Sequence, residues 1–125
     1  MDIALWIVQI LLAVIFLLTG FMKLSRSKEA VVAGGMHAME SYTPSSIRLI
    51  GLLEILGALG LILPSLTGIL PWLTPLAAIG LALTMVGALI THASRREYPN
   101  MIVNLILLSL ALFVAYGRLF LVPIV

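Results

Sequence analysis

Residues 47–63 read IRLIGLLEILGALGLIL and contain a single carboxylate, Glu54, among Leu, Ile, Gly and Ala. A charged side chain at the centre of a membrane span costs at least about 2.5 kcal/mol, so it is rare there and usually has a role. Gly51, Gly57 and Ala58 lie three or four residues from Glu54 and share its helical face. Small residues let membrane helices approach closely. The stretch therefore predicts a transmembrane helix whose Glu54 points into protein and takes its partner from another helix.

The composition is that of a polytopic membrane protein. Of 125 residues, 62% are hydrophobic and 10% are charged, whereas soluble domains are about 45–50% apolar and about 25% charged. A membrane helix needs about 20 residues, so four spans would use about two thirds of the chain and leave no separate soluble domain. We therefore expect an all-α fold with one domain over residues 1–125, a four-transmembrane-helix bundle.

Four apolar segments define the expected spans, which are residues 3–22, 47–63, 72–92 and 101–120. Pro64 is expected to end the second span, and Pro99 marks a break before the fourth. The one long connection, residues 27–46, has a loose apolar face that Gly34 and Gly35 weaken as a helix. We expect it to form a short interfacial segment between the first two spans.

Basic residues indicate the orientation of the bundle. Those around the first and third links are Lys23, Arg26, Lys28, Arg48, Arg95 and Arg96, and the second link has none. Because Lys and Arg accumulate in cytoplasmic loops, we expect the basic links to be cytoplasmic and both termini to be outside. The protein would then be integral to the plasma or inner membrane. Arg118, near the outer end of the fourth span, is the single exception.

Several classes of protein are excluded. The chain has no cysteine, so it offers no thiolate metal site and no thiol or disulfide chemistry. His37 and Glu40 are expected to be surface residues, and no metal site is predicted. No basic run adjoins exposed aromatic residues, so the net charge of +2 does not indicate nucleic-acid binding. The N-terminal apolar stretch lacks a basic start and a small-residue cleavage site, and is expected to be a retained helix.

Each predicted helix supplies one polar side chain to the cytoplasmic half of the bundle, and the four are Lys23, Glu54, His92 and Asn104. Glu54 lies ~10 Å into its span, while Lys23 and His92 close theirs and can reach inward. We predict a cluster in which His92 and Asn104 complete the hydrogen bonds of a Lys23–Glu54 ion pair. Gln9 and Arg118 should meet near the outer end as a second polar layer.

Two interpretations of this cluster stay open. Taken singly, Lys23 is typical of a flanking residue, His92 of an interfacial one and Asn104 of a hydrogen bond between helices. A purely structural network would meet the needs of Glu54 without any ligand. Alternatively, the cluster is a ligand-binding or proton-handling site, because ionisable groups within membranes mark such sites. No catalytic residue is assigned.

Four runs of sequence are loose singly but specific together: GFMKL at 20–24, IGLLEILGALGLILP at 50–64, LTPLAAIGLALTMVGALITH at 73–92 and NLILLSLALFVAYGR at 104–118. Together they resemble the DoxX-like membrane proteins, over essentially the whole chain. The resemblance implies a four-helix integral membrane fold whose matching polar positions are Lys23, Glu54, His92 and Asn104. The family is named after a small subunit associated with thiosulfate:quinone oxidoreduction. Some relatives are tied to oxidative-stress complexes, and distant animal relatives resemble assembly chaperones for receptor channels.

We expect this chain to bind a small amphipathic molecule dissolved in the membrane, a quinone or a lipid-like compound. Its polar head would bind the cluster, and the protein would be an accessory to a membrane redox process rather than an enzyme. The chain has no cysteine and no metal or flavin motif, which argues against an autonomous redox role, and quinone is the one candidate cofactor.

Two alternatives remain. One is a membrane chaperone or a structural subunit of a larger complex, in which the cluster is purely structural. The other is proton-coupled transport, for which four helices without a sequence repeat offer little support. Contact with membrane lipid is expected in every case. A homodimer or a membrane-protein partner is compatible with so thin a bundle.

Overall fold

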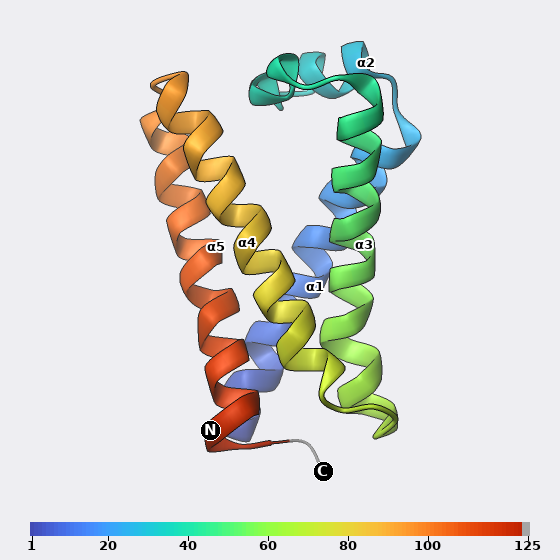
Figure 1. Ribbon diagram of the computed structural model, residues 1–125, viewed down its shortest axis with the longest axis vertical. Helices are drawn as coiled ribbons and strands as arrows, with labels where there is room; N and C mark the ends of the chain where they lie inside the picture. Colours follow the sequence, from blue (N-terminus) through green and yellow to red (C-terminus); the bar gives the residue numbers. More distant parts are fainter. Residues whose placement is uncertain (124–125) are drawn as a thin grey trace.

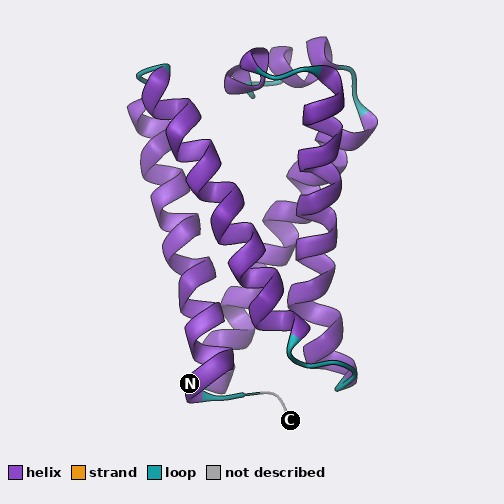
Figure 2. Ribbon diagram, in the orientation of Figure 1, coloured by secondary structure: helices purple, strands orange, loops and turns teal. Residues whose placement is uncertain are grey.

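The computed structural model describes residues 1–123, which form four long helices and a short segment across one end of them (Figure 1). The long helices are α1 (Asp2–Ser25), α3 (Pro44–Thr67), α4 (Leu73–Ser94) and α5 (Tyr98–Tyr116), and α5 continues as a π-helical turn, η2 (Gly117–Leu121). The described residues contain no strand (Figure 2). All four long helices, the last counted with η2, are long and apolar enough to cross a membrane. The predicted all-α, four-helix membrane fold is confirmed.

Helix α3 continues past the proline that was expected to end it. It begins after Thr43, whose hydroxyl accepts from the Ser46 N–H at 3.1 Å, and Pro44 occupies its first turn. Pro64 lies inside the helix, so the predicted end of this span is wrong. The helix ends at Gly68, whose φ of 72° is left-handed and whose N–H donates to the Pro64 carbonyl at 3.0 Å. Pro64 lacks the N–H for one helical hydrogen bond, but the helix continues for one more turn. That turn is closed by the hydrogen bond from the Gly68 N–H to the Pro64 carbonyl.

The long connection forms two short helices, α2 (Lys28–Ala33) and the 3-10 helix η1 (His37–Ser41). Gly35 joins them with a φ of 112°, a conformation that residues with a side chain rarely adopt. This α2–η1 segment (residues 28–41) lies across the end of the bundle where α1 ends and α3 begins (Figure 1). We call this the α2 end. The N-terminus lies at the opposite end.

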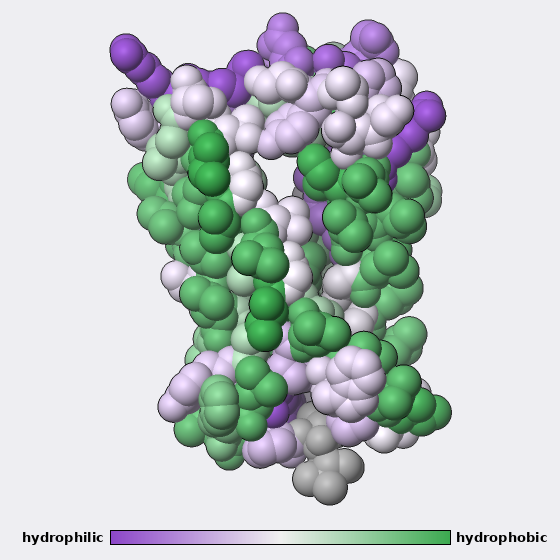
Figure 3. Space-filling model, in the orientation of Figure 1, coloured by the Kyte–Doolittle hydropathy of each residue, from purple (hydrophilic) through white to green (hydrophobic). Residues whose placement is uncertain are grey.

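The four long helices form two pairs, α1 with α3 and α4 with α5. Helices α3 and α4 are also in contact, whereas α1 and α5 touch over a short length only. The two pairs diverge toward the α2 end, where the α2–η1 segment spans the space between them (Figure 1). An apolar band covers the middle of the molecule, and polar residues gather at the α2 end (Figure 3). This distribution fits a protein surrounded by lipid along its length.

Two glycines bring the backbones of α1 and α3 together. A Cβ atom on Gly20 would lie 2.7 Å from the Gly51 carbonyl oxygen, and one on Gly51 would lie 2.7 Å from that of Gly20. Neither position therefore has room for a side chain. Lys23 and Glu54 each follow one of these glycines by three residues. Because side chains lean toward the N-terminus of their own helix and the helices are antiparallel, the two side chains lean toward each other.

The apolar core lies between the pairs and is built from residues of all four long helices. Its buried members are Leu12, Ala13, Phe16, Ala58, Leu61, Ala78, Leu81, Ala82, Met85, Ala111, Val114 and Ala115. Many of them are alanines, so the helices approach closely, as small residues allow in membrane proteins.

We predict that Gly51→Ala lowers the free energy of unfolding by about 1–3 kcal/mol, because the added methyl overpacks the α1–α3 contact. Gly80→Ala is the matched control, since a Cβ atom there meets nothing within 4 Å. Thermal denaturation in mild detergent, followed by circular dichroism, measures both. Equal melting temperatures for the two variants would contradict the close contact.

Candidate ligand-binding site

A buried ion pair joins α1 to α3. The ammonium group of Lys23 donates to Glu54 Oε1, which confirms the ion pair predicted from the sequence. The side chain of Glu54 is 1% exposed and that of Lys23 is 13% exposed. Removing one partner of a buried pair leaves an uncompensated charge and costs about 3–5 kcal/mol. The pair therefore holds α1 and α3 in a single register.

Thr19 completes the coordination of the carboxylate. Its Oγ1 donates to Glu54 Oε2 over 2.6 Å, so each carboxylate oxygen of Glu54 has its own donor. Thr19 was not among the residues predicted from the sequence. The available signal was its spacing, because Thr19 precedes Lys23 by four residues and lies on the same face of α1.

His92 does not complete the ion pair, so that part of the prediction is wrong. Its Nδ1 lies 2.9 Å from Glu97 Oε1, in the link between α4 and α5. Glu97 also pairs with Arg95, at 3.3 Å between Oε1 and Nε. The cause is distance along the chain: Glu97 is five residues from His92 and reaches it without crossing the bundle.

The partners of Glu97 favour its charged form. The hydrogen bond with His92 has the largest effect, and it outweighs the opposing desolvation of the carboxyl. Arg95 also lowers the pKa of Glu97, through a hydrogen bond and through its positive charge, and the charge of His92 adds to this effect. The pKa of Glu97 therefore lies below its ordinary value.

Asn104 is buried without a protein partner. Its side chain is 9% exposed and makes no hydrogen bond within residues 1–123, with Nδ2 fully enclosed. The expected hydrogen bond from Asn104 to the ion pair is therefore absent from this part of the chain. A buried amide without a partner costs about 1–3 kcal/mol, so its position calls for an explanation.

A cavity of about 310 Å³ brings the four predicted residues together. Lys23 of α1, Glu54 of α3, His92 of α4 and Asn104 of α5 all line it. The other lining groups are mostly apolar, and include Phe16, Met85 and Leu107. The four side chains thus share one cavity without forming one hydrogen-bonded cluster. A few polar groups in a mainly apolar cavity are typical of small-molecule sites.

A second cavity, of about 280 Å³, adjoins the first and shares Lys23, Met85, Ala88 and His92 with it. It opens between α3 and α4, where Ile50 and Thr84 line it. Figure 3 shows an opening between the helix pairs beneath the α2–η1 segment. We call the two cavities together the polar chamber.

The α2–η1 segment covers the polar chamber. Ala38 and Met39 of η1 line both cavities. Tyr42 bonds to Thr91 through the two hydroxyls, and Arg95 bonds to Ser41 Oγ at 3.3 Å. The end of the segment that leads into α3 is therefore tied to the C-terminal end of α4.

Gln9 and Arg118 meet at the opposite end of the bundle, where Arg118 Nε donates to Gln9 Oε1 over 2.7 Å. Gln9 Nε2 donates in turn to Leu61 O at 2.6 Å and to Ser65 Oγ at 3.4 Å. Ser65 lies 2.7 Å from the Thr74 hydroxyl, so one chain of hydrogen bonds passes through all four long helices. This layer lies outside the polar chamber and holds that end of the bundle together.

The described residues contain no group of three His, Cys, Asp or Glu side chains that could hold a metal ion. His37 lines the first cavity, and Glu40 lies 3.6 Å from Arg95 Nη2. The two therefore face different partners. Both residues are exposed, as the sequence predicts, and His37 also lines the first cavity of the chamber.

Comparison with protein families finds a match to the DoxX-like family over residues 7–114. The matched range begins within α1, ends within α5 and contains Lys23, Glu54, His92 and Asn104. Comparisons with curated proteins and with solved structures find no match.

We predict that Thr19→Val lowers the free energy of unfolding by about 1.5–3 kcal/mol, because it removes a hydrogen bond to a charged, buried carboxylate. Thr84→Val is the control, since among residues 1–123 the Thr84 hydroxyl donates only to Gly80 O of its own helix, at 3.0 Å. Chemical or thermal denaturation in detergent compares the two. A smaller loss for Thr19→Val than for Thr84→Val would contradict the role of Thr19.

We predict that Glu97 makes stability depend on pH. Because its pKa is lower in the folded protein, the folded state binds this proton less readily than the unfolded state. Glu97 therefore contributes to the free energy of unfolding at pH values above the ordinary carboxyl pKa of about 4.3. This contribution is lost as the pH falls through the lowered pKa of Glu97 in the folded protein. Melting temperatures between neutral and acidic pH should therefore fall more steeply for the wild type than for Glu97→Gln. Glu29→Gln, an exposed position, should match the wild type.

Proposed function

Since this chain belongs to the DoxX-like family of membrane proteins, we propose that it binds a small amphipathic molecule dissolved in the membrane. The molecule is a quinone or a lipid-like compound, and its polar head binds in the polar chamber. The protein serves as an accessory to a membrane redox process, and the ligand carries the electrons. The observation that supports this proposal is the cavity to which each of the four long helices contributes at least one polar side chain, with Asn104 left without a partner among the described residues.

The donors and acceptors of the chamber suit a carbonyl-bearing head. Lys23 has three N–H donors and uses one for Glu54. The amide of Asn104 can present either its oxygen or its nitrogen by rotating about its last bond. His92 uses Nδ1 for Glu97, which leaves Nε2 for a ligand. A neutral ring offers an acceptor there to a hydroquinone hydroxyl, and a protonated ring offers a donor to a quinone carbonyl.

The basic residues support an orientation with the α2 end in the cytoplasm and both termini outside, in the plasma or inner membrane. Lys23, Arg26, Lys28, Arg48, Arg95 and Arg96 all lie toward that end. Under this orientation the polar chamber lies in the cytoplasmic half of the membrane.

A second candidate function is that of a chaperone or structural subunit, in which the polar residues only hold the bundle together. The observation in its favour is that both carboxylate oxygens of Glu54 already have donors within the protein. It leaves the unpartnered amide of Asn104 without a purpose. The two functions therefore differ in what they require of Asn104.

We predict that native mass spectrometry in mild detergent finds a small molecule retained by the wild type and lost from Asn104→Leu. Leucine has a similar size and removes an unsatisfied polar group, so the variant should melt at the same temperature or higher. Glu54→Gln is the companion variant, which should lose both the ligand and stability. Leu108→Ile, a conservative change on α5 outside the polar chamber, is the control.

A wild type that carries no small molecule, and no quinone on extraction, would contradict ligand binding. A stoichiometric partner protein retained equally by the wild type and Asn104→Leu would then favour the structural subunit.

A further inference from the structure

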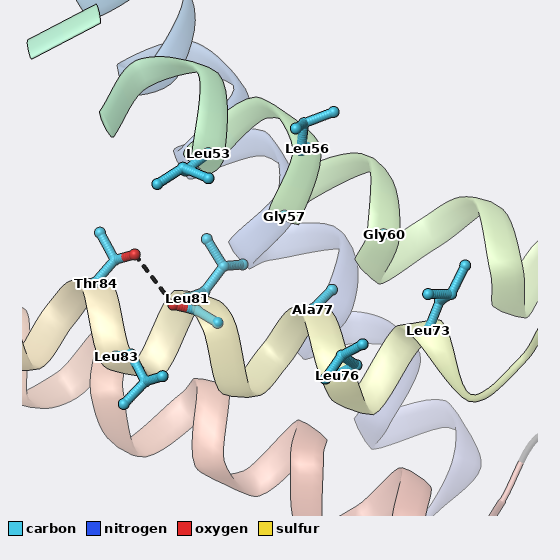
Figure 4. Close-up of a pocket in the computed structure, with 11 residues that line it drawn as sticks. Leu53, Leu56, Gly57, Gly60, Leu73, Leu76, Ala77, Leu81, Leu83 and Thr84 are labelled. Carbon is cyan, nitrogen blue, oxygen red and sulfur yellow. Dashed lines mark hydrogen bonds between the residues drawn. The ribbon is translucent and has the colours of Figure 1, made fainter. Parts of the chain in front are cut away.

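An apolar groove runs along the outside of the bundle between α3 and α4, with a volume of about 730 Å³ (Figure 4). It is larger than either cavity of the polar chamber. Its lining is aliphatic apart from Thr84. The Thr84 hydroxyl donates to the Gly80 carbonyl of its own helix. Four of its leucines, Leu53, Leu56, Leu76 and Leu83, are exposed. The groove therefore offers packing to a hydrocarbon and no hydrogen bond to a polar group.

Glycines create the depth of the groove. Gly57 and Gly60 of α3 and Gly80 of α4 line it without a side chain. A Cβ atom on Gly80 would meet nothing within 4 Å, so the space in front of this residue is empty. In Figure 4, Leu81 and Ala77 of α4 extend toward α3 across the groove.

The groove continues from the polar chamber. Thr84 lines both the groove and the adjoining cavity of the chamber. On α3, Ile50 lines that cavity and Leu53, one turn further along, lines the groove. A single elongated molecule can therefore lie in both, with its polar end beneath the α2–η1 segment and its apolar end between α3 and α4.

The length of the groove matches one leaflet of a membrane. From Thr84 to Leu73 it follows eleven residues of α4, which is ~16 Å at 1.5 Å per residue. Half of the ~30 Å hydrocarbon layer is ~15 Å. Thr84 lies near the middle of α4 (Leu73–Ser94), so a hydrocarbon chain that leaves the chamber there would extend from about the middle of the membrane toward the end away from α2.

The charges of the chamber favour a neutral head group. The ammonium of Lys23 is already neutralised by Glu54, and the remaining titratable groups lining the chamber are His37, Tyr42 and His92. A phosphate would bring a negative charge to a site that has no free Lys or Arg. A quinone ring is neutral and presents two carbonyl acceptors, which suit the N–H donors of Lys23 and, once its amide rotates toward the cavity, of Asn104.

We propose that the α3–α4 groove holds the single hydrocarbon tail of a quinone whose ring binds in the polar chamber. This inference rests on the proposed function and specifies its ligand: a neutral, carbonyl-bearing ring with one long tail, rather than a two-chained phospholipid. Gly80 sets how much of the tail fits against α4.

The test compares two probes, a ubiquinone-type benzoquinone without a tail and the same ring with a decyl chain. Their affinities for the purified protein are measured by native mass spectrometry titration in mild detergent. The test variant is Gly80→Leu, which fills the groove from an open position. The matched control is Ser109→Leu, which adds the same side chain to an exposed position on α5 outside every cavity described here.

We expect Gly80→Leu to weaken binding of the decyl quinone by about tenfold, and to leave the tailless quinone unchanged. Ser109→Leu should leave both affinities unchanged. Equal decyl-quinone affinities for the wild type and Gly80→Leu would overturn the tail site while leaving ring binding intact. A dimer that Gly80→Leu converts to a monomer, or a phospholipid that it alone displaces, would assign the groove to that occupant instead. A wild type that binds neither probe would overturn the proposed function and the tail site together.

Discussion

The buried negative charge of Glu54 needs a positive partner, and α1 packs against α3 so that Lys23 supplies it. Gly20 and Gly51 remove the side chains that would hold the two backbones apart, and the antiparallel direction then makes Lys23 and Glu54 lean toward each other. A shift by one helical turn, about 5.4 Å, would separate the charges and press a side chain against the opposite backbone. The ion pair and the two glycines therefore fix the register of α1 against α3.

Polar contacts at the two ends of the bundle differ in kind. At the end away from α2, Arg118, Gln9, Ser65 and Thr74 link all four long helices in one chain of hydrogen bonds. At the α2 end, the ties between the two pairs run through the α2–η1 segment and the end of α4. The helices can diverge only where the direct links are missing. The polar chamber lies at the α2 end, where the two pairs diverge.

The fold and part of the site were predictable from the sequence. Four apolar segments and one mid-span carboxylate predict a bundle, and helical depth was enough to pair Lys23 with Glu54. The contacts that could not be predicted depend on local competition. His92 takes the nearer carboxylate of Glu97, and Thr19 supplies the second donor to Glu54 because one turn of α1 brings its hydroxyl there. Pro64 gave a false helix end, because the capping geometry of Gly68 decides where α3 stops.

The α2–η1 segment covers the chamber at the end of the bundle. The chamber is open at its sides, between helices that face lipid. A molecule that enters from the side arrives by diffusion in the plane of the bilayer. Under the proposed function, the fraction of protein with ligand in the chamber would depend on the mole fraction of that molecule among the lipids, and its concentration in the surrounding water would have little effect. Exchange with another membrane protein would need no aqueous step, so two proteins in the same membrane could share one pool of ligand without touching.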